Sequence, residues 1–215
     1  LGKAIPGELA GSPIGESWEV SAHPGGVSRV ANGALAGRPL DEVVGAWGEA
    51  LLGPGVAERH CGSFPLIVKL IEVNALASVQ VHPDEEHAMR AERCPYGKSE
   101  AWYIIEAGPR AEAWLGLRPG VDADRLRAAV RYGTVPALLE RASLAAGDCV
   151  MLDAGTVHAC GNGILLLEVQ QACDITYRIH DWGRGRELHL EQALAVIDYA
   201  ARPRVRRSAG GPDTA

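Results

Sequence analysis

Residues 147–162, with the sequence GDCVMLDAGTVHACGN, decide the fold of this 215-residue chain. The segment predicts a strand over residues 148–152, a tight turn at Gly155 and a second strand that returns past His158. A strand, a glycine turn and a returning strand aim the His158 imidazole into the mouth of a β-barrel. A surface hairpin that carries an incidental histidine is the alternative interpretation of the same residues.

Short apolar runs separated by glycine and proline continue this pattern along the chain. The 26 glycines and 13 prolines are spread through the sequence, as in sandwiches and barrels built from many short strands. Helical spacing of apolar residues predicts a helical insert at 121–144 and a C-terminal helix at 188–201. We therefore expect one mostly β domain over residues 1–201 and a flexible tail at 202–215. The predicted strands are residues 17–21, 66–72, 77–82, 101–106, 111–117, 148–152, 164–170 and 175–182.

The composition excludes several function classes. Lys and Arg total 21 against 27 Asp and Glu, a net charge of −6, so the chain lacks the basic face that nucleic-acid binding needs. No apolar run approaches the roughly 20 residues that cross a bilayer. No secretory-type start is present either, so we expect a cytoplasmic protein with no membrane partner. The five cysteines form no C-x-x-C pair, which argues against a disulfide framework or a zinc knuckle.

Four residues supply a donor set suited to a divalent transition metal. Ser78, Gln80 and His82 are two apart in the segment SVQVHP, so they share one face of a predicted strand. Three polar groups facing a barrel interior are costly unless something there uses them. Glu100 opens the next predicted strand, and His158 comes from the hairpin. Together Gln80, His82, Glu100 and His158 offer two oxygens and two nitrogens, with coordination positions open to substrate.

Seven segments occur in one order along nearly the whole chain, from about Ile14 to Ala200. They are Gly15-Glu-Ser-Trp-Glu-Val-Ser21, Pro65-Leu-Ile-Val-Lys-Leu-Ile71, Ser78-Val-Gln-Val-His-Pro83, Gly97-Lys-Ser-Glu-Ala-Trp-Tyr103, Ala154-Gly-Thr-Val-His-Ala159, Glu168-Val-Gln-Gln171 and Asp174-Ile-Thr-Tyr-Arg-Ile-His-Asp-Trp-Gly183. Together they closely resemble type I phosphomannose isomerases of the cupin superfamily. Residues 147–162 also resemble the second metal-binding motif of cupins, with Asp153 in place of the usual proline. The resemblance implies a cupin-type jelly-roll β-barrel.

The resemblance also implies a reaction and a cofactor. The family interconverts mannose 6-phosphate and fructose 6-phosphate through a cis-enediol, and Gln80, His82, Glu100 and His158 match its zinc ligands. One zinc ion per chain is therefore expected, although the same donors accommodate manganese, cobalt or iron. A dication stabilises the negative charge that develops on the enediolate oxygens.

Further residues match positions around the family's substrate. Arg178 and Asp174 lie in the segment that supplies an active-site arginine and aspartate. Arg178 is predicted to place positive charge beside the enediolate, and Asp174 to help open the sugar ring. Lys98 matches an active-site lysine, and with Ser78 and Lys69 it is predicted to bind the sugar phosphate. Lys98, Asp174 and a hydroxide on the metal are all candidates for the base that takes the C2 proton.

Two other function classes use a pocket of this type. An iron-dependent cupin oxygenase is disfavoured, because Gln80 and the late Glu100 differ from the usual two-histidine opening of that motif. A non-catalytic sugar-binding cupin is expected to lose a metal ligand or Arg178, and neither loss occurs.

Family members usually carry a further strand-forming segment at the start and a second β domain after the last helix. We therefore expect either a shortened form or a fragment, with its oligomeric state open.

Overall fold

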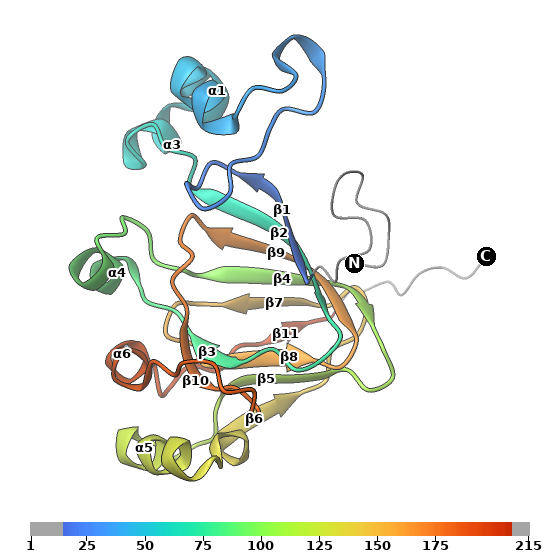
Figure 1. The fold of residues 1–215 in the computed structure, drawn as a ribbon, viewed down its shortest axis with the longest axis vertical. Coiled ribbons are helices and arrows are strands. Elements are labelled where there is room, and N and C mark those ends of the chain that lie inside the picture. Colours follow the sequence, from blue (N-terminus) through green and yellow to red (C-terminus); the bar gives the residue numbers. More distant parts are fainter. Residues whose placement is uncertain (1–14, 208–215) are drawn as a thin grey trace.

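The computed structural model describes residues 15–207, which form two antiparallel β-sheets facing each other across a shared core (Figure 1). The six-stranded sheet has the order β1 (Glu16–Ser21), β2 (Leu66–Val73), β9 (Ile164–Gln171), β4 (Glu100–Ala107), β7 (Cys149–Leu152) and β11 (Val205–Arg206). The five-stranded sheet has the order β10 (Tyr177–His180), β3 (Val79–Val81), β8 (His158–Gly161), β5 (Glu112–Leu117) and β6 (Leu139–Ala142). The mostly β class is confirmed, and all eight predicted strand segments overlap observed strands.

Strand β9 shows why the interior is apolar at one end and polar at the other. Its inward residues Ile164, Leu166, Glu168 and Gln170 are all buried, and they alternate with partly exposed residues on the outer face. Ile164 and Leu166 join an apolar cluster that draws on both sheets, whereas Glu168 and Gln170 lie outside that cluster. Buried polar groups are stable only with partners, so the polar end is where a functional site is expected.

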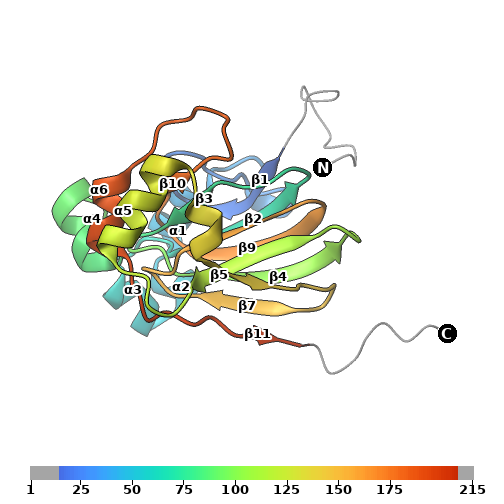
Figure 2. The same cartoon turned by 90° about the horizontal axis from the view of Figure 1, so that it is seen from below.

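Two helices cover the outer face of the five-stranded sheet (Figure 2). Helix α5 (Ala123–Tyr132) is capped at its start by Asp122, whose side chain accepts a hydrogen bond from the backbone N–H of Arg125. It ends at Gly133, which adopts the left-handed conformation that suits glycine. Together with α6 (Leu190–Val196), this helix packs on an apolar cluster from β3, β5, β8 and β10. The apolar face of that sheet is thereby separated from its polar inner face.

The helical insert predicted at 121–144 is correct only in its first half. Residues 134–144 contain a 3₁₀ turn, η2 (Val135–Leu138), followed by strand β6. The prediction is wrong there because Leu139 pairs with Leu117 on β5, so the chain continues as a strand. Pairing with the edge of β5 therefore decides the conformation of residues 139–142.

The C-terminal helix is shorter than the predicted 188–201. It ends at Val196, because the backbone N–H of Asp198 donates to Gly155 O at 2.9 Å and holds the following chain against the turn before β8. The tail predicted from residue 202 is attached over its first residues. Strand β11 pairs with β7, and Arg207 forms an ion pair with the Asp148 carboxylate. Residues 208–215 lie outside the described part of the chain.

Four further helices are not predicted from the sequence. Between β1 and β2 lie the 3₁₀ turn η1 (Gly33–Leu35) and helices α1 (Leu40–Trp47), α2 (Glu49–Leu52) and α3 (Pro54–Arg59), and α4 (Glu85–Glu92) follows β3. Figure 1 shows α1 and α3 beyond the β1 edge of the six-stranded sheet. Within residues 15–207, none of the helices has the length and apolarity to cross a bilayer.

Candidate active site

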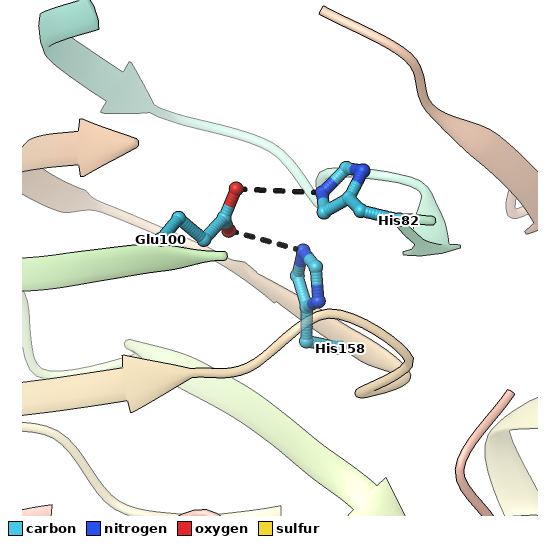
Figure 3. Close-up of side chains that lie close together, drawn as sticks. All are labelled: His82, Glu100 and His158. Atoms are coloured by element: carbon cyan, nitrogen blue, oxygen red, sulfur yellow. Dashed lines mark ion pairs between the residues drawn. The ribbon is translucent and has the colours of Figure 1, made fainter. Parts of the chain in front are cut away.

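Three buried side chains converge between the two sheets (Figure 3). His82 follows β3, Glu100 is the first residue of β4 and His158 is the first residue of β8. Glu100 Oε2 lies 3.4 Å from His82 Nε2, and Glu100 Oε1 lies 3.3 Å from His158 Nε2. One potential ligand atom from each residue falls within 4.8 Å of the others. Three of the four predicted metal ligands therefore meet at one point.

Backbone carbonyls fix the orientation of both imidazoles. His82 Nδ1 lies 2.9 Å from Ile175 O, and His158 Nδ1 lies 2.9 Å from Thr156 O. Because a carbonyl oxygen only accepts, each Nδ1 must be the protonated nitrogen. In the neutral ring Nε2 then carries a lone pair directed into the cluster, which is the arrangement typical of metal-binding histidines.

The electrostatics of the cluster fit a divalent cation. Burial, together with the nearby charge of Lys98, holds the pKa of His82 well below its usual range, and burial lowers the pKa of His158 to about 4. Both rings are therefore neutral electron-pair donors at pH 7. Across residues 15–207, His82 Nε2 and Glu100 Oε2 find no hydrogen-bond partner although both atoms are buried. Buried polar atoms normally have partners, and a cation would satisfy both.

Gln80 lies beside this cluster on β3. It pairs in register with His158 on β8, so the two side chains share the inner face of the sheet. Gln80 Nε2 lies 3.3 Å from His158 Nε2, while Gln80 Oε1 accepts a hydrogen bond from the Ser78 hydroxyl at 3.2 Å. In this conformation the amide oxygen faces Ser78 and the amide nitrogen faces the histidine.

The two predicted lysines are buried next to carboxylates. Lys98 Nζ is 3.6 Å from Glu100 Oε2, and Lys69 Nζ is 3.5 Å from Asp174 Oδ1 and 4.0 Å from Glu168 Oε1. Burial by itself lowers the pKa of Lys98, but the surrounding carboxylates outweigh burial and the pKa is raised. Lys98 is therefore an ammonium at neutral pH, which makes it a poor general base.

Arg178 lies on β10, opposite Gln80 in the strand register, and so faces the same interior. Its Nη1 donates to Glu187 O at 2.8 Å. Its Nε is buried and has no hydrogen-bond partner within the described chain. Burial and the neighbouring positive charge of Arg186 lower the pKa of Arg178. The predicted active-site arginine thus places an unused donor near the candidate ligands.

Glu168 and Trp102 are site residues that the sequence argument assigns no role. Trp102 Nε1 donates to Glu100 Oε1 at 3.1 Å and to Glu168 Oε2 at 3.0 Å. Burial, reinforced by the Glu100 charge, raises the pKa of Glu168 to about 7. The signal for Glu168 is present in the sequence, because it occupies an inward position of β9 where the alternation calls for an apolar residue.

A cavity of about 330 Å³ adjoins this cluster, a size within the range of small-molecule sites. Its lining includes the predicted ligand Gln80 and the predicted substrate residue Ser78, together with Glu168. Lys69, Lys98 and Arg178 are not among its lining residues in the described chain. Two arginines with no predicted role, Arg184 and Arg186, do line it.

Comparisons with known proteins identify what the chain is similar to. Residues 1–103 match the family model for the catalytic domain of type I phosphomannose isomerase. The mannose-6-phosphate isomerase of Streptococcus mutans is 40% identical over 203 residues, which cover 92% of this chain and 61% of that protein. The crystal structure of the Bacillus subtilis mannose 6-phosphate isomerase is 36% identical with a TM-score of 0.79, covering 87% of this chain and 60% of that one. A zinc-bound mannose 6-phosphate isomerase structure, 19% identical with a TM-score of 0.68 over 88% of this chain and 67% of its own, supports the fold alone.

The chain spans only about 60% of the length of the Streptococcus and Bacillus proteins. The solved neighbours share its two-sheet architecture, which confirms the cupin-type fold predicted from residues 147–162. In sequence and in fold, the chain is similar to the catalytic region of type I phosphomannose isomerases, as its seven ordered motifs predict.

Proposed function

We propose that the chain interconverts mannose 6-phosphate and fructose 6-phosphate with the help of one divalent metal ion. The proposal depends above all on the buried cluster of His82, Glu100 and His158, whose donor atoms converge while two of them lack hydrogen-bond partners in residues 15–207. The similarity to mannose-6-phosphate isomerases supplies the substrate and the reaction. Residues 1–201 are the proposed catalytic domain, and a cytoplasmic location stays a prediction.

We assign Gln80, His82, Glu100 and His158 as the protein ligands and zinc as the metal. Zinc accepts mixed nitrogen and oxygen donors, and catalytic zinc sites leave a position for substrate. A bound zinc ion supplies Lewis-acid stabilisation of the negative charge on the enediolate oxygens.

The surrounding residues bind the sugar and balance its charge. Isomerisation moves one proton from C2 to C1 of the open-chain sugar and another from the C2 hydroxyl to O1. Arg178 places positive charge beside the enediolate, through the buried Nε that has no partner in residues 15–207. Asp174, whose side chain is half exposed, exchanges protons with the ring and anomeric oxygens during ring opening. Lys98, Lys69 and Ser78 donate hydrogen bonds to oxygens of the sugar.

We assign the transfer between C2 and C1 to Glu168. Its pKa of about 7 lies near the pH of the cell interior, where a group both accepts and releases a proton readily. The Trp102 indole occupies Oε2, so Oε1 is the atom that holds the moving proton. Glu168 also lines the cavity together with Ser78 and Gln80, which puts it on the substrate side of the cluster.

The rival functions gain no support. The similar proteins of known name are isomerases, and no comparison points to an iron-dependent oxygenase or a non-catalytic sugar-binding cupin. A non-catalytic cupin would have no need of the inward polar side chains of Gln80, Glu100 and Glu168 around a metal cluster, because each costs free energy to bury.

A coupled assay tests the proposal. Zinc-loaded protein is incubated with mannose 6-phosphate, and fructose 6-phosphate is measured with and without a chelator. We expect production that the chelator abolishes and added zinc restores. Absence of chelator-sensitive production from protein that carries one zinc per chain would contradict the isomerase function.

A further inference from the structure

Arg184 and Arg186 are held together by one buried carboxylate on the loop after β10. Asp181 Oδ1 accepts from Arg184 Nη2 at 2.7 Å and from Arg186 Nε at 3.0 Å, and Asp181 Oδ2 accepts from the backbone N–H of Arg186 at 3.2 Å. The Asp181 side chain is 4% exposed, whereas the two arginine side chains are 41% and 49% exposed. A buried acid therefore orients two guanidinium groups whose outer parts reach solvent.

This cluster carries surplus positive charge. The hydrogen bonds from Arg186 and Arg184 lower the pKa of Asp181, so its carboxylate is ionised at neutral pH. Arg178 lies close enough for its pKa to be lowered by both arginines. The other acidic neighbour of Arg178 is Glu187, whose side chain is 83% exposed and therefore screened by water. Two guanidinium groups thus contact a single buried carboxylate, and the third, that of Arg178, lies close enough to feel their charge.

The two guanidinium groups retain donors for a further acceptor. Arg186 uses Nε and Nη2 in its contacts with Asp181, and its Nη1 donors have no partner in residues 15–207. Arg184 Nη1 donates to Leu76 O at 2.7 Å, which ties the loop after β10 to the segment before β3. The pair is therefore preorganised, because both side chains are fixed before any ligand arrives.

The arginine pair opens onto the cavity that also reaches the candidate ligand Gln80. Arg184 and Arg186 are its only cationic lining residues in the described chain, and Ser78, Gln80 and Glu168 line the same space. Glu16 and Glu72 line it as well, so an anion is favoured only beside the arginines. Lys69 and Lys98 do not line it, and each lies within 4.0 Å of at least one carboxylate.

We infer that Arg184 and Arg186 bind the phosphoryl group of the substrate, and that Asp181 positions both side chains for this contact. A phosphate monoester dianion presents several oxygens, and the planar guanidinium fork matches two of them at once. The identity of the sugar attached to the phosphate rests on the proposed function, whereas the phosphate site itself does not. Phosphate bound here leaves the sugar free to extend along the cavity toward Gln80.

Calorimetric titration of zinc-loaded protein with inorganic phosphate tests the site directly. We expect Arg184→Gln and Arg186→Gln each to weaken phosphate binding about tenfold to a hundredfold, the loss that goes with one charged hydrogen-bonding partner. Arg90→Gln is the matched control, because Arg90 is an exposed arginine on α4 whose side chain contacts Glu86 and His87 and does not line the cavity. Phosphate affinity within twofold of wild type in both cavity variants would overturn the inference and assign the phosphate to the metal instead. Undetectable phosphate binding by the wild-type protein would overturn it as well.

Kinetics with mannose 6-phosphate separate this inference from the isomerase proposal. We expect the Gln variants to raise KM tenfold or more with a much smaller change in kcat. An active wild-type enzyme whose variants keep the wild-type KM would contradict the phosphate site and leave the isomerase function standing. Arginine-dependent phosphate binding by a protein that does not isomerise the sugar would support the site and contradict the function.

If either Gln variant unfolds, Arg186→Lys tests the phosphate site instead. Lysine keeps the positive charge but lacks the planar guanidinium fork, so we expect it to bind phosphate about tenfold more weakly.

Discussion

Glu100 and Glu168 share a single hydrogen-bond donor, the indole N–H of Trp102, which lies 3.1 Å from one carboxylate and 3.0 Å from the other. Glu168 is opposite Trp102 in the register of β9 and β4, so the contact is built into the sheet. One neutral donor thereby holds two buried carboxyl groups side by side. The candidate metal ligand and the proposed proton-transfer group are linked through this indole.

Removal of the shared donor is expected to weaken both roles. In Trp102→Phe the ring volume is largely kept, but both carboxylate oxygens lose their partner. Loss of a residue that orients a metal ligand typically costs 10–100-fold in metal affinity or activity. We expect zinc affinity and kcat each to fall about tenfold or more, as measured by chelator competition and by the coupled assay.

Trp114→Phe is the matched control for that variant. Trp114 is equally buried, but it packs in the apolar cluster under α5 and α6, away from the carboxylates. Equal effects of the two substitutions on zinc affinity would show that the indole N–H has no special role.

Glu168 is expected to make the stability of the metal-free protein depend on pH. Its pKa is raised from near 4.5 to about 7 by burial and by Glu100, so the folded state binds more protons than the unfolded state between these two values. The free energy of unfolding therefore falls as the pH rises from about 4.5 through 7. Urea unfolding across this range should give a shallower pH dependence for Glu168→Gln, and no such change for the exposed Glu140→Gln. Identical slopes for the wild type and Glu168→Gln would refute the assignment.

His158 is expected to be essential for metal retention. In His158→Ala the cluster loses one of its two neutral nitrogens, and Gln80 loses its cross-strand partner. Metal analysis after dialysis should give about one zinc per chain for the wild type and close to none for the variant. His60→Ala removes a half-buried histidine outside the cluster and should leave the metal content unchanged. A His158→Ala protein that still holds one zinc per chain is incompatible with the proposed ligand set.

Gly155 is expected to be intolerant of a side chain. It has a φ of +86°, and an added Cβ would lie 2.9 Å from Val196 O and 3.1 Å from the backbone nitrogen of Asp198. Gly155→Ala should therefore lower the free energy of unfolding by about 2–4 kcal/mol in a urea titration. Gly133→Ala is the comparison, because Gly133 also has a positive φ but no atom within 4 Å of the added Cβ. It should lose only about 1–2 kcal/mol, and an equal loss in both variants would mean that the contact with the end of α6 has no effect.

The strands are largely predictable from the sequence because alternation along β2, β4 and β9 is a local property. Segment 134–144 is not, because pairing of Leu139 with Leu117 on β5 overrides its helical spacing. The short helices between β1 and β2 also escape prediction. Gly48 and Gly53 adopt positive φ angles and interrupt the helical backbone there. No helix between β1 and β2 is therefore long enough to show a clear helical repeat of apolar residues.

The candidate metal ligands are predictable because polar residues at inward strand positions are rare and costly. Glu168 occupies an inward position of the same kind, but only the strand register reveals that it meets Trp102 and Lys69. The role of Arg184 and Arg186 is harder still to predict from the sequence. Charged residues in a glycine-containing loop usually face solvent, and their shared contact with Asp181 exists only in three dimensions.

The most direct test of the central claim is the rate of fructose 6-phosphate formation as zinc is titrated into metal-free protein. If His82, Glu100 and His158 hold the metal that serves the reaction, the rate should rise in proportion to bound zinc and reach a plateau at one zinc per chain. A rate that stays at zero when that stoichiometry is reached, or that does not depend on bound metal, would contradict the account.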